Sequence, residues 1–243
     1  MKKLLFLFIA FNLYAEQIYA SFDVVAQKSA KLSMQALGIV NKINVEIGQY
    51  VKKGDVLLEL DHNLELVGLE EARVQQTLAS KALKLATSTQ QRYQQVKSVL
   101  NEQTLDEINF KQNEAEQRLK SANMASKKYE TIISQKKLKA PFNGLITAKL
   151  IELGEGVASP VQALFILDSY PDVKLLLSFD EKYINEVKVG DTYEYIIDGL
   201  KTSGKISKVY PSIDVKTRKV YAEVLAKDLK IGSFGEGYII TGK

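Results

Sequence analysis

Residues 69–140 decide the fold, and they read LEEARVQQTLASKALKLATSTQQRYQQVKSVLNEQTLDEINFKQNEAEQRLKSANMASKKYETIISQKKLKA. The stretch contains no glycine or proline, and strong helix formers dominate it. It breaks at residues 101–104, where Thr104 and Glu107 have the spacing of a capping box, which predicts Thr104 as the cap of a second helix. We therefore predict a helical hairpin over residues 62–139, with its tip near 101–104 and arms about 50 Å long.

Each predicted arm carries a stripe of residues that step by three or four, which is the spacing of a helix face packed against a partner helix. The stripe positions are Val74, Leu78, Ala82, Leu85, Thr89, Tyr93, Val96 and Leu100 on the first arm, and Ile108, Gln112, Ala115, Leu119, Ala122, Ser126, Tyr129 and Ile133 on the second. Because several of them are small or polar, we expect the stripes to close a thin seam between the arms and not a globular core.

The hairpin interrupts an internal repeat. In residues 38–61 and 144–168 the first two glycines are ten residues apart, a valine follows three residues after the second glycine, and an apolar pair occurs shortly before a final aspartate. The motif positions are Gly38, Gly48 and Gly54 in the first copy and Pro141, Gly144 and Gly154 in or beside the second. Two half-domains that each expose one apolar face can bury it only against one another. We therefore predict that residues 37–61 and 140–170 form one β-domain across the hairpin.

Residues 171–243 predict a further β-rich unit. Short apolar runs are separated by turn signals, among which Asp198-Gly199 favours a tight hairpin. Asp180 is placed to cap a short helix that extends to Val187. Five or so strands in this segment predict a small β-barrel. The predicted fold class is therefore α+β and elongated, with a split β-domain, an inserted antiparallel helical hairpin and a following barrel.

The N-terminal residues 1–20 have the pattern of a secretory signal peptide. A basic start is followed by an apolar run over residues 4–13, which is shorter than the roughly 20 residues that span a bilayer. Ala15 and Ala20 offer cleavage sites, so we predict removal after one of them and a mature protein in the periplasm, at the inner-membrane face. An uncleaved membrane anchor is the alternative. Residues 21–36 are predicted as lead-in strands.

Composition excludes several chemistries. The chain has no cysteine, which excludes disulfides, thiolate metal sites and a cysteine nucleophile. Its net charge of +4 is spread along the chain without a dense basic block, so nucleic acid is not a predicted partner. His62 is the only histidine, and one of its neighbours, Asp61 or Asn63, is predicted to cap the first helix. We predict no enzymatic activity, no cofactor and no resident metal.

The two copies of the repeat resemble the halves of a biotinyl/lipoyl-carrier domain, in which a lysine for modification lies on the turn that joins the halves. Here the hairpin replaces that turn. A split lipoyl-like domain with an inserted coiled-coil hairpin and a β-barrel resembles the periplasmic adaptors, or membrane fusion proteins, of tripartite RND-type efflux systems. Residues 51–57, 140–144 and 211–218 each resemble a family signature, the last with Thr217 and Arg218.

This resemblance implies the partners and the contact site. The protein is expected to link an inner-membrane transporter, RND-type in the first place, to a TolC-type outer-membrane channel, and to associate with itself into a hexameric ring for export of drugs or other small molecules. Family members meet the channel through an arginine, a leucine and a serine at the hairpin tip. Arg92 matches the arginine, Val96 stands for the leucine, and Thr104 stands for the serine one residue late.

Three alternatives stay open. In the first two, the transport partner would be an ABC-type exporter or a secretion system. In the third, the chain would be a structural coiled-coil protein of the envelope with no transport partner. Family members commonly continue past the barrel into a membrane-proximal domain, and this chain ends shortly after the last predicted strand. The resemblance therefore implies a short form, or a remnant of that domain within residues 22–34.

Overall fold

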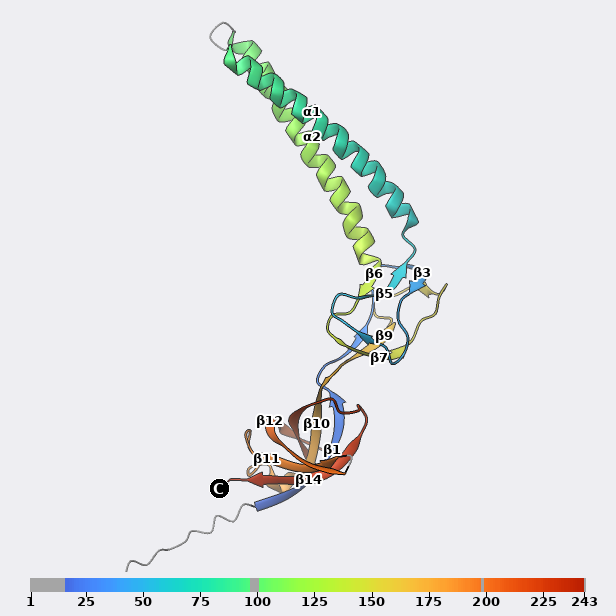
Figure 1. The fold of residues 1–243 in the computed structure, drawn as a ribbon, viewed down its shortest axis with the longest axis vertical. Coiled ribbons are helices and arrows are strands. Elements are labelled where there is room, and N and C mark those ends of the chain that lie inside the picture. The colour runs from blue at the N-terminus through green and yellow to red at the C-terminus, as the bar shows by residue number, and fades with distance from the viewer. Residues whose placement is uncertain (1–15, 97–100, 198, 243) are drawn as a thin grey trace, which may run out of the picture.

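A computed structural model describes residues 16–96, 101–197 and 199–242, and it shows three modules in a line (Figure 1). The helical hairpin projects from one side of a small β-module, and a β-barrel lies on the other side of that module. The hairpin consists of α1 (Asn63–Gln95) and α2 (Glu102–Gln135), with 33 and 34 residues. At 1.5 Å per residue each helix is about 50 Å long, as predicted.

The β-module consists of two four-stranded sheets that mix strands from both copies of the repeat. One sheet has the order β2 (Ser29–Leu32), β9 (Phe165–Ser169), β7 (Gly144–Lys149), β4 (Tyr50–Val51), and the other β6 (Lys137–Lys139), β5 (Val56–Leu60), β3 (Gly38–Ile43), β8 (Gly156–Val157). Val51 pairs with Gly144, and Val157 pairs with Gly38, so equivalent positions make reciprocal contacts. The prediction that the two copies close on each other is confirmed.

Gly144 is held where no side chain fits, which yields a stability prediction. A Cβ atom on Gly144 would lie 2.1 Å from the carbonyl oxygen of Asp168, and that oxygen belongs to the backbone of the neighbouring strand β9. Because a sheet backbone cannot move aside, we expect Gly144→Ala to lower the free energy of unfolding by about 2 to 3 kcal/mol. Urea unfolding measures the change.

Gly156→Ala is the matched control, because a Cβ atom there would meet only Ile39 Cδ1, at 3.8 Å. We expect its unfolding free energy to change by less than about 0.5 kcal/mol. Equal effects of the two substitutions would contradict the close-approach argument.

The barrel is closed and has six strands in the order β1-β10-β13-β12-β11-β14. Their bounds are β1 (Glu16–Ala26), β10 (Asp172–Asp180), β11 (Thr192–Ile197), β12 (Leu200–Asp214), β13 (Lys219–Lys227) and β14 (Phe234–Thr241), with a 3₁₀ turn at Glu181–Tyr183. The Asp180 side chain accepts a hydrogen bond from the Lys182 amide, as predicted, but the helix is shorter than expected. Ile197 pairs with Leu200 around the predicted Asp198-Gly199 turn, where Asp198 lies outside the described residues.

The sixth strand corrects the reading of the N-terminal segment. Residues 16–20, assigned to the signal peptide, form the first half of β1, and Ile18 and Ala20 are fully buried in the barrel core. Residues 21–36 do contain the predicted strands, but these strands belong to the two β-domains, because β1 closes the barrel between β10 and β14 while β2 pairs with β9. The alternation of buried Ile18, Ala20, Phe22 and Val24 is a strand signal that the adjacent apolar run obscured.

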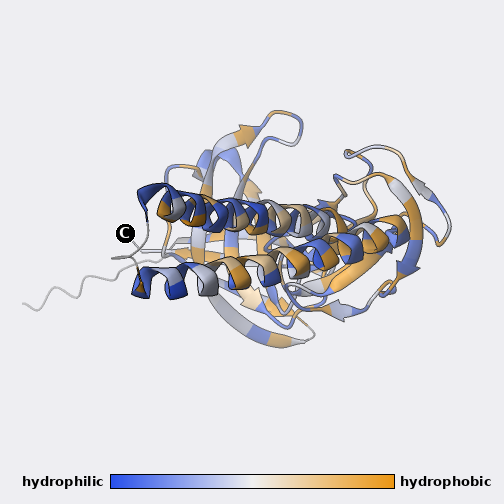
Figure 2. Cartoon of the chain, turned by 90° about the horizontal axis from the view of Figure 1, so that it is seen from above, coloured by the Kyte–Doolittle hydropathy of each residue, from blue (hydrophilic) through white to orange (hydrophobic). Residues whose placement is uncertain are grey.

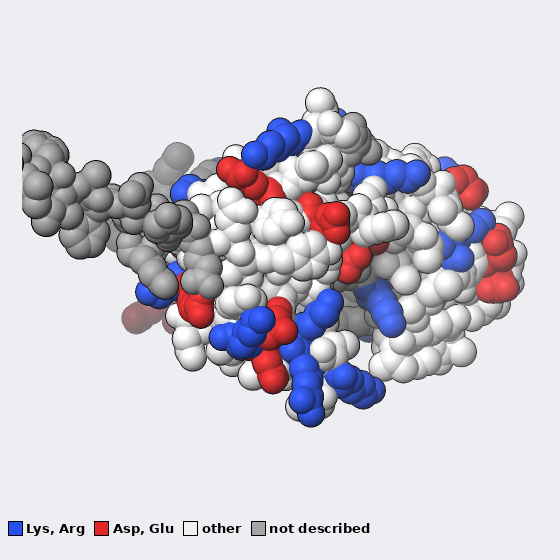
Figure 3. All heavy atoms as spheres, turned by 90° about the horizontal axis from the view of Figure 1, so that it is seen from below, with Lys and Arg blue, Asp and Glu red and all other residues white. Residues whose placement is uncertain are grey.

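Lysine and arginine side chains are interspersed with aspartate and glutamate on the face seen from the barrel end of the molecule (Figure 3). No large field of a single sign covers that face, so shape and apolar contact have to supply a large part of any recognition there.

Candidate functional site

The seam of the hairpin follows the predicted stripe on α2 but not on α1. All eight predicted positions of α2 are at least partly buried, and Ala115 and Ser126 are buried fully. On α1 the prediction is wrong. Val74, Leu78 and Leu85 are 50%, 55% and 65% exposed, and Leu100 lies outside the described residues. The α1 positions that are buried or partly buried at heptad spacing are instead Leu69, Ala72, Gln76, Ala79, Leu83, Ala86 and Gln90.

The side-chain amides in this seam explain why apolar periodicity does not predict it on α1. Gln76 Nε2 donates to Asn123 Oδ1 at 2.7 Å, and Gln90 Nε2 donates to Asn109 Oδ1 at 2.9 Å, in both cases from α1 to α2. Arg73 adds an ion pair with Glu130 at 3.3 Å. The seam thus consists of alanine, leucine and paired amides, whereas apolar periodicity selects a stripe with more large apolar residues. Two glutamines 14 residues apart on one arm and two asparagines 14 residues apart on the other are the sequence signal that could have predicted this seam.

The candidate contact residues of α1 lie exposed at its last turn. The Arg92 guanidinium donates to Ser88 O from Nε and to Thr89 Oγ1 from Nη2, both at 3.3 Å. A guanidinium carries five N–H donors, so these contacts within the helix leave donors for a partner. Val96 is 47% exposed and ends the helix, with its amide donating to Tyr93 O. Residues 97–100, which directly precede the predicted tip near 101–104, lie outside the described residues.

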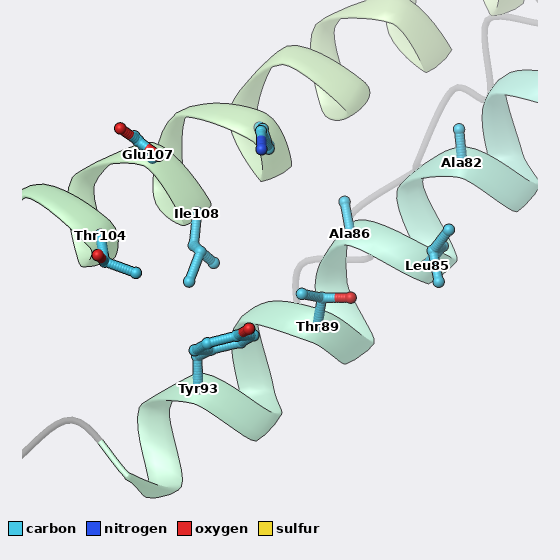
Figure 4. A pocket seen from close by; sticks show the side chains of 9 residues that line it. Ala82, Leu85, Ala86, Thr89, Tyr93, Thr104, Glu107 and Ile108 are labelled. Atoms are coloured by element: carbon cyan, nitrogen blue, oxygen red, sulfur yellow. The ribbon is translucent and has the colours of Figure 1, made fainter. Parts of the chain in front are cut away.

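Thr104 is not the cap of α2, which corrects the capping-box prediction. Asn101 is the N-cap, and its side chain accepts a hydrogen bond from the Thr104 amide at 2.8 Å. Asparagine caps as well as threonine does, and it precedes Thr104 at the spacing that a cap requires. Thr104 itself is half-buried beside a groove of about 490 Å³, where Ile108 of α2 points toward Tyr93 of α1 (Figure 4). Arg92 does not line this groove.

The motif glycines serve the turns of the β-module. Gly48, Gly54 and Gly154 have φ values of +83°, +96° and +85°, a region that favours glycine. The segments around Gly54 and Pro141 lie against each other, because the Gly54 amide donates to Ala140 O and the Lys53 amide donates to Asn143 Oδ1, both at 2.8 Å. These two family-like segments therefore form one turn cluster.

The signature at residues 211–218 forms the turn between β12 and β13. Asp214 Oδ1 accepts hydrogen bonds from the amides of Thr217 and Lys216, at 2.9 Å each, and these bonds hold the pKa of Asp214 below its usual value. Arg218 adopts a left-handed φ of 54° and donates its amide to Asp214 O. Sequence reasoning selected Thr217 and Arg218, but Asp214 organises the turn.

His62 marks the junction of β5 and α1. It is the N-cap of α1 without a side-chain cap bond, and its Nδ1 lies 2.7 Å from Leu60 O. Asp61 Oδ1 accepts a hydrogen bond from the Asn63 amide at 3.1 Å, so Asp61 supplies part of the predicted capping. Within the described ranges, no group of three or more His, Cys, Asp or Glu side chains is placed to hold a metal ion. No helix in those ranges is long and apolar enough to cross a membrane.

Comparison with known proteins finds a matching family model and several relatives of this chain. The model of the CzcB-like barrel-sandwich hybrid domain matches residues 28–168. The cobalt-zinc-cadmium resistance protein CzcB of Cupriavidus metallidurans is 28% identical over 208 residues, covering 81% of this chain and 39% of CzcB. The multidrug resistance protein MdtA of Photorhabdus laumondii is 26% identical over 169 residues, covering 68% of this chain and 42% of MdtA. The chain thus spans less than half the length of these relatives.

Solved structures share the fold. A MacA-MexA chimera with the α-hairpin of Pseudomonas aeruginosa MexA has a TM-score of 0.68 at 19% identity, covering 93% of this chain and 81% of the chimera. The membrane fusion protein Spr0693 of Streptococcus pneumoniae has a TM-score of 0.67 at 14% identity, covering 93% of this chain and 99% of Spr0693. The family model covers more than half of the residues. The chain therefore belongs to the family of the CzcB-like barrel-sandwich hybrid domain.

Proposed function

We propose that this protein links an inner-membrane efflux transporter, RND-type in the first place, to a TolC-like outer-membrane channel. The observation that carries the proposal is the base of the hairpin. The Leu60 amide donates to Lys136 O at 2.9 Å, and Lys136 Nζ forms a 2.7 Å ion pair with Glu65, so both helices are fixed to one sheet. A rod of about 50 Å held in this way supplies reach away from the β-module and the barrel.

Partner recovery tests the proposal. Crosslinking in living cells followed by affinity purification is expected to recover a transporter and an outer-membrane channel, and the class of the transporter separates an RND-type from an ABC-type partner. Recovery of this chain alone would favour the rival function of a structural envelope protein.

The exported substrate is proposed from the relatives' names only. CzcB is named for cobalt, zinc and cadmium resistance and MdtA for multidrug resistance. Cells that lack the gene should therefore be tested against Co²⁺, Zn²⁺, Cd²⁺ and a panel of drugs. Sensitivity that is restored by the gene identifies the cargo class, and unchanged sensitivity to all of them would contradict an export role for these two classes.

We also propose a periplasmic location through a cleaved signal peptide, and the barrel predicts the cleavage site. Cleavage after Ala20 would remove residues 16–20, which pair with residues 237–241 of β14 and include buried Ile18. We therefore expect cleavage after Ala15. N-terminal sequencing of the exported protein should find Glu16 first. Finding Ser21 first would contradict the role of residues 16–20 in the barrel, and finding Met1 would remove the argument for location.

A further inference from the structure

The β-module and the barrel have separate cores. Among the described residues, one cluster of buried apolar side chains lies inside the barrel and a second lies in the β-module, and neither includes buried residues of the other domain. Hydrophobic and hydrophilic residues alternate along the β-strands, as expected for strands that each face one core (Figure 2). The chain crosses between the two domains at residues 27–28 and at residues 170–171. The orientation of one domain relative to the other is therefore set at this junction, not by a shared core.

The two strands that cross the junction differ in length. The last residue pair on the side of the β-module is Ser29 with Asp168, and the first pair on the side of the barrel is Ala26 with Val173. Two residues of one strand thus oppose four residues of the other. A regular ladder of backbone hydrogen bonds cannot continue through such a mismatch, so side chains have to complete the bonding there.

Ser169 completes it. Its amide donates to Lys28 O at 2.8 Å, while its Oγ accepts a hydrogen bond from the Lys28 amide at 3.0 Å and donates one to Asp172 O at 2.9 Å. On its other side Ser169 pairs with Gly144 of β7, which fixes it within the β-module. The side chain is buried, since Ser169 is only 6% exposed. One hydroxyl therefore connects the β-module to the crossing strand and to the first residue of the barrel strand β10.

Two further hydrogen bonds brace the junction, but on the side of the barrel. Gln27 Nε2 donates to Val173 O at 3.1 Å, and the Asp228 amide donates to Pro171 O at 3.0 Å. Neither bond reaches a residue of the β-module. Without the hydroxyl, the backbone bond from the Ser169 amide to Lys28 O would remain, so the domains would stay connected but less firmly braced.

A cavity of about 240 Å³ lies beside the junction. Its lining includes Lys28, Ser169 and Asp172 of the junction together with Phe142 and Asn143, which belong to the turn before β7. A polar cavity of this size admits water, which can take over the partners of a lost hydroxyl. It also leaves space for the turn at residues 142–143 to approach the junction when the domains tilt.

We propose that Ser169 is a positioning residue whose hydroxyl fixes the direction of the helical rod relative to the barrel, and that the junction becomes a hinge when this hydroxyl is lost. Because the rod is held by the β-module, a tilt at the junction is carried to its tip. A tilt of about 10° at the base of a rod about 50 Å long displaces the tip by about 9 Å. The inference concerns the shape of the chain itself and does not depend on the proposed transport partners.

Distances between two spin labels test the proposal on the purified chain. Because the chain has no cysteine, Lys42→Cys on β3 and Ser203→Cys on β12, both exposed, place one label on each domain. Double electron–electron resonance should give one narrow distance distribution when Ser169 is intact. Ser169→Ala is expected to widen this distribution at least about two-fold, because residues at the ends of strands absorb the change in backbone angles. Ser169→Thr keeps the hydroxyl and should leave the distribution narrow.

Ser178→Ala is the matched control. Ser178 Oγ lies 2.9 Å from Ser21 Oγ across β1 and β10, so this substitution removes a hydroxyl contact between strands within the barrel. It should leave the distance distribution unchanged. A narrow distribution in Ser169→Ala, or equal widening in Ser178→Ala, would overturn the proposal. Widening in Ser169→Thr as well would assign the effect to the fit of the side chain and overturn the role of the hydroxyl.

Hydrogen exchange supplies a reading that needs no substitution at Ser169. The Lys28 amide, which donates to the buried hydroxyl, should exchange as slowly as the paired amides of β9 in the unaltered chain. Rapid exchange at Lys28 would show that the brace is open in solution and would overturn the proposal. Urea unfolding of Ser169→Ala should still show a cooperative transition, which separates a hinge from an unfolded domain.

Discussion

Replacing residues 61–135 by Asn-Gly is expected to abolish export while the β-module and the barrel still fold. Strands β5 and β6 already pair, with Glu59 opposite Lys137, and the Leu60 amide donates to Lys136 O at 2.9 Å. Leu60 and Lys136 are thus positioned as the residues that flank a two-residue turn, and Asn-Gly is the dipeptide that such a turn favours. The substitution restores the short connection of a lipoyl-like domain and removes only the rod.

The fold and the function of this variant are measured by separate assays. Circular dichroism should lose most of its helical signal and keep its strand signal, and urea unfolding should still show a cooperative transition. Export, assayed on the cargo class found for the intact protein, should fall to the level of cells without the gene. Loss of the cooperative transition would show that the two halves need the hairpin to close, contrary to the reciprocal pairing of Val51 with Gly144 and Val157 with Gly38.

The two-halved β-module could be predicted from sequence because the same pattern of glycines and apolar residues occurs in both halves. A repeated spacing of Gly38 to Gly48 and Gly144 to Gly154 is hard to produce by chance, and two equal halves with one apolar face each have one way to bury it. The barrel was harder. Its sixth strand, β1, lies more than 140 residues before its partner β10, and no local pattern indicates so distant a pairing. The apolar run before β1 also has the pattern of a signal peptide, and Ala20 offers a cleavage site inside the strand, so residues 16–20 are easily assigned to that peptide.

The seam of α1 could not be predicted because two faces of the helix compete. Apolar periodicity favours the face of Val74, Leu78 and Leu85, and a lone amphipathic helix would bury that face. The structure instead buries Leu69 and Ala72 and half-buries Gln76 and Gln90, whose side-chain amides donate to asparagines of α2. The paired amides therefore outweigh the larger apolar residues in setting which face of α1 meets α2.

Exchanging Arg92 for Asp is expected to abolish export without loss of expression or folding. Arg92 is exposed at the last turn of α1, and its side-chain hydrogen bonds to Ser88 and Thr89 stay within that helix, so its replacement breaks neither of these bonds across the hairpin. A hydrogen bond from a charged donor contributes about 1.5 to 3 kcal/mol, and an aspartate would in addition repel the oxygen atoms that accepted it.

Lys84→Asp is the matched control for Arg92→Asp, since it makes the same change of charge at an exposed α1 position away from the tip. It should leave export unchanged. Thermal unfolding of both variants should match that of the unaltered protein. Lost export by Arg92→Asp alone, with unchanged unfolding, assigns Arg92 to the channel contact, and unchanged export would remove Arg92 from that contact.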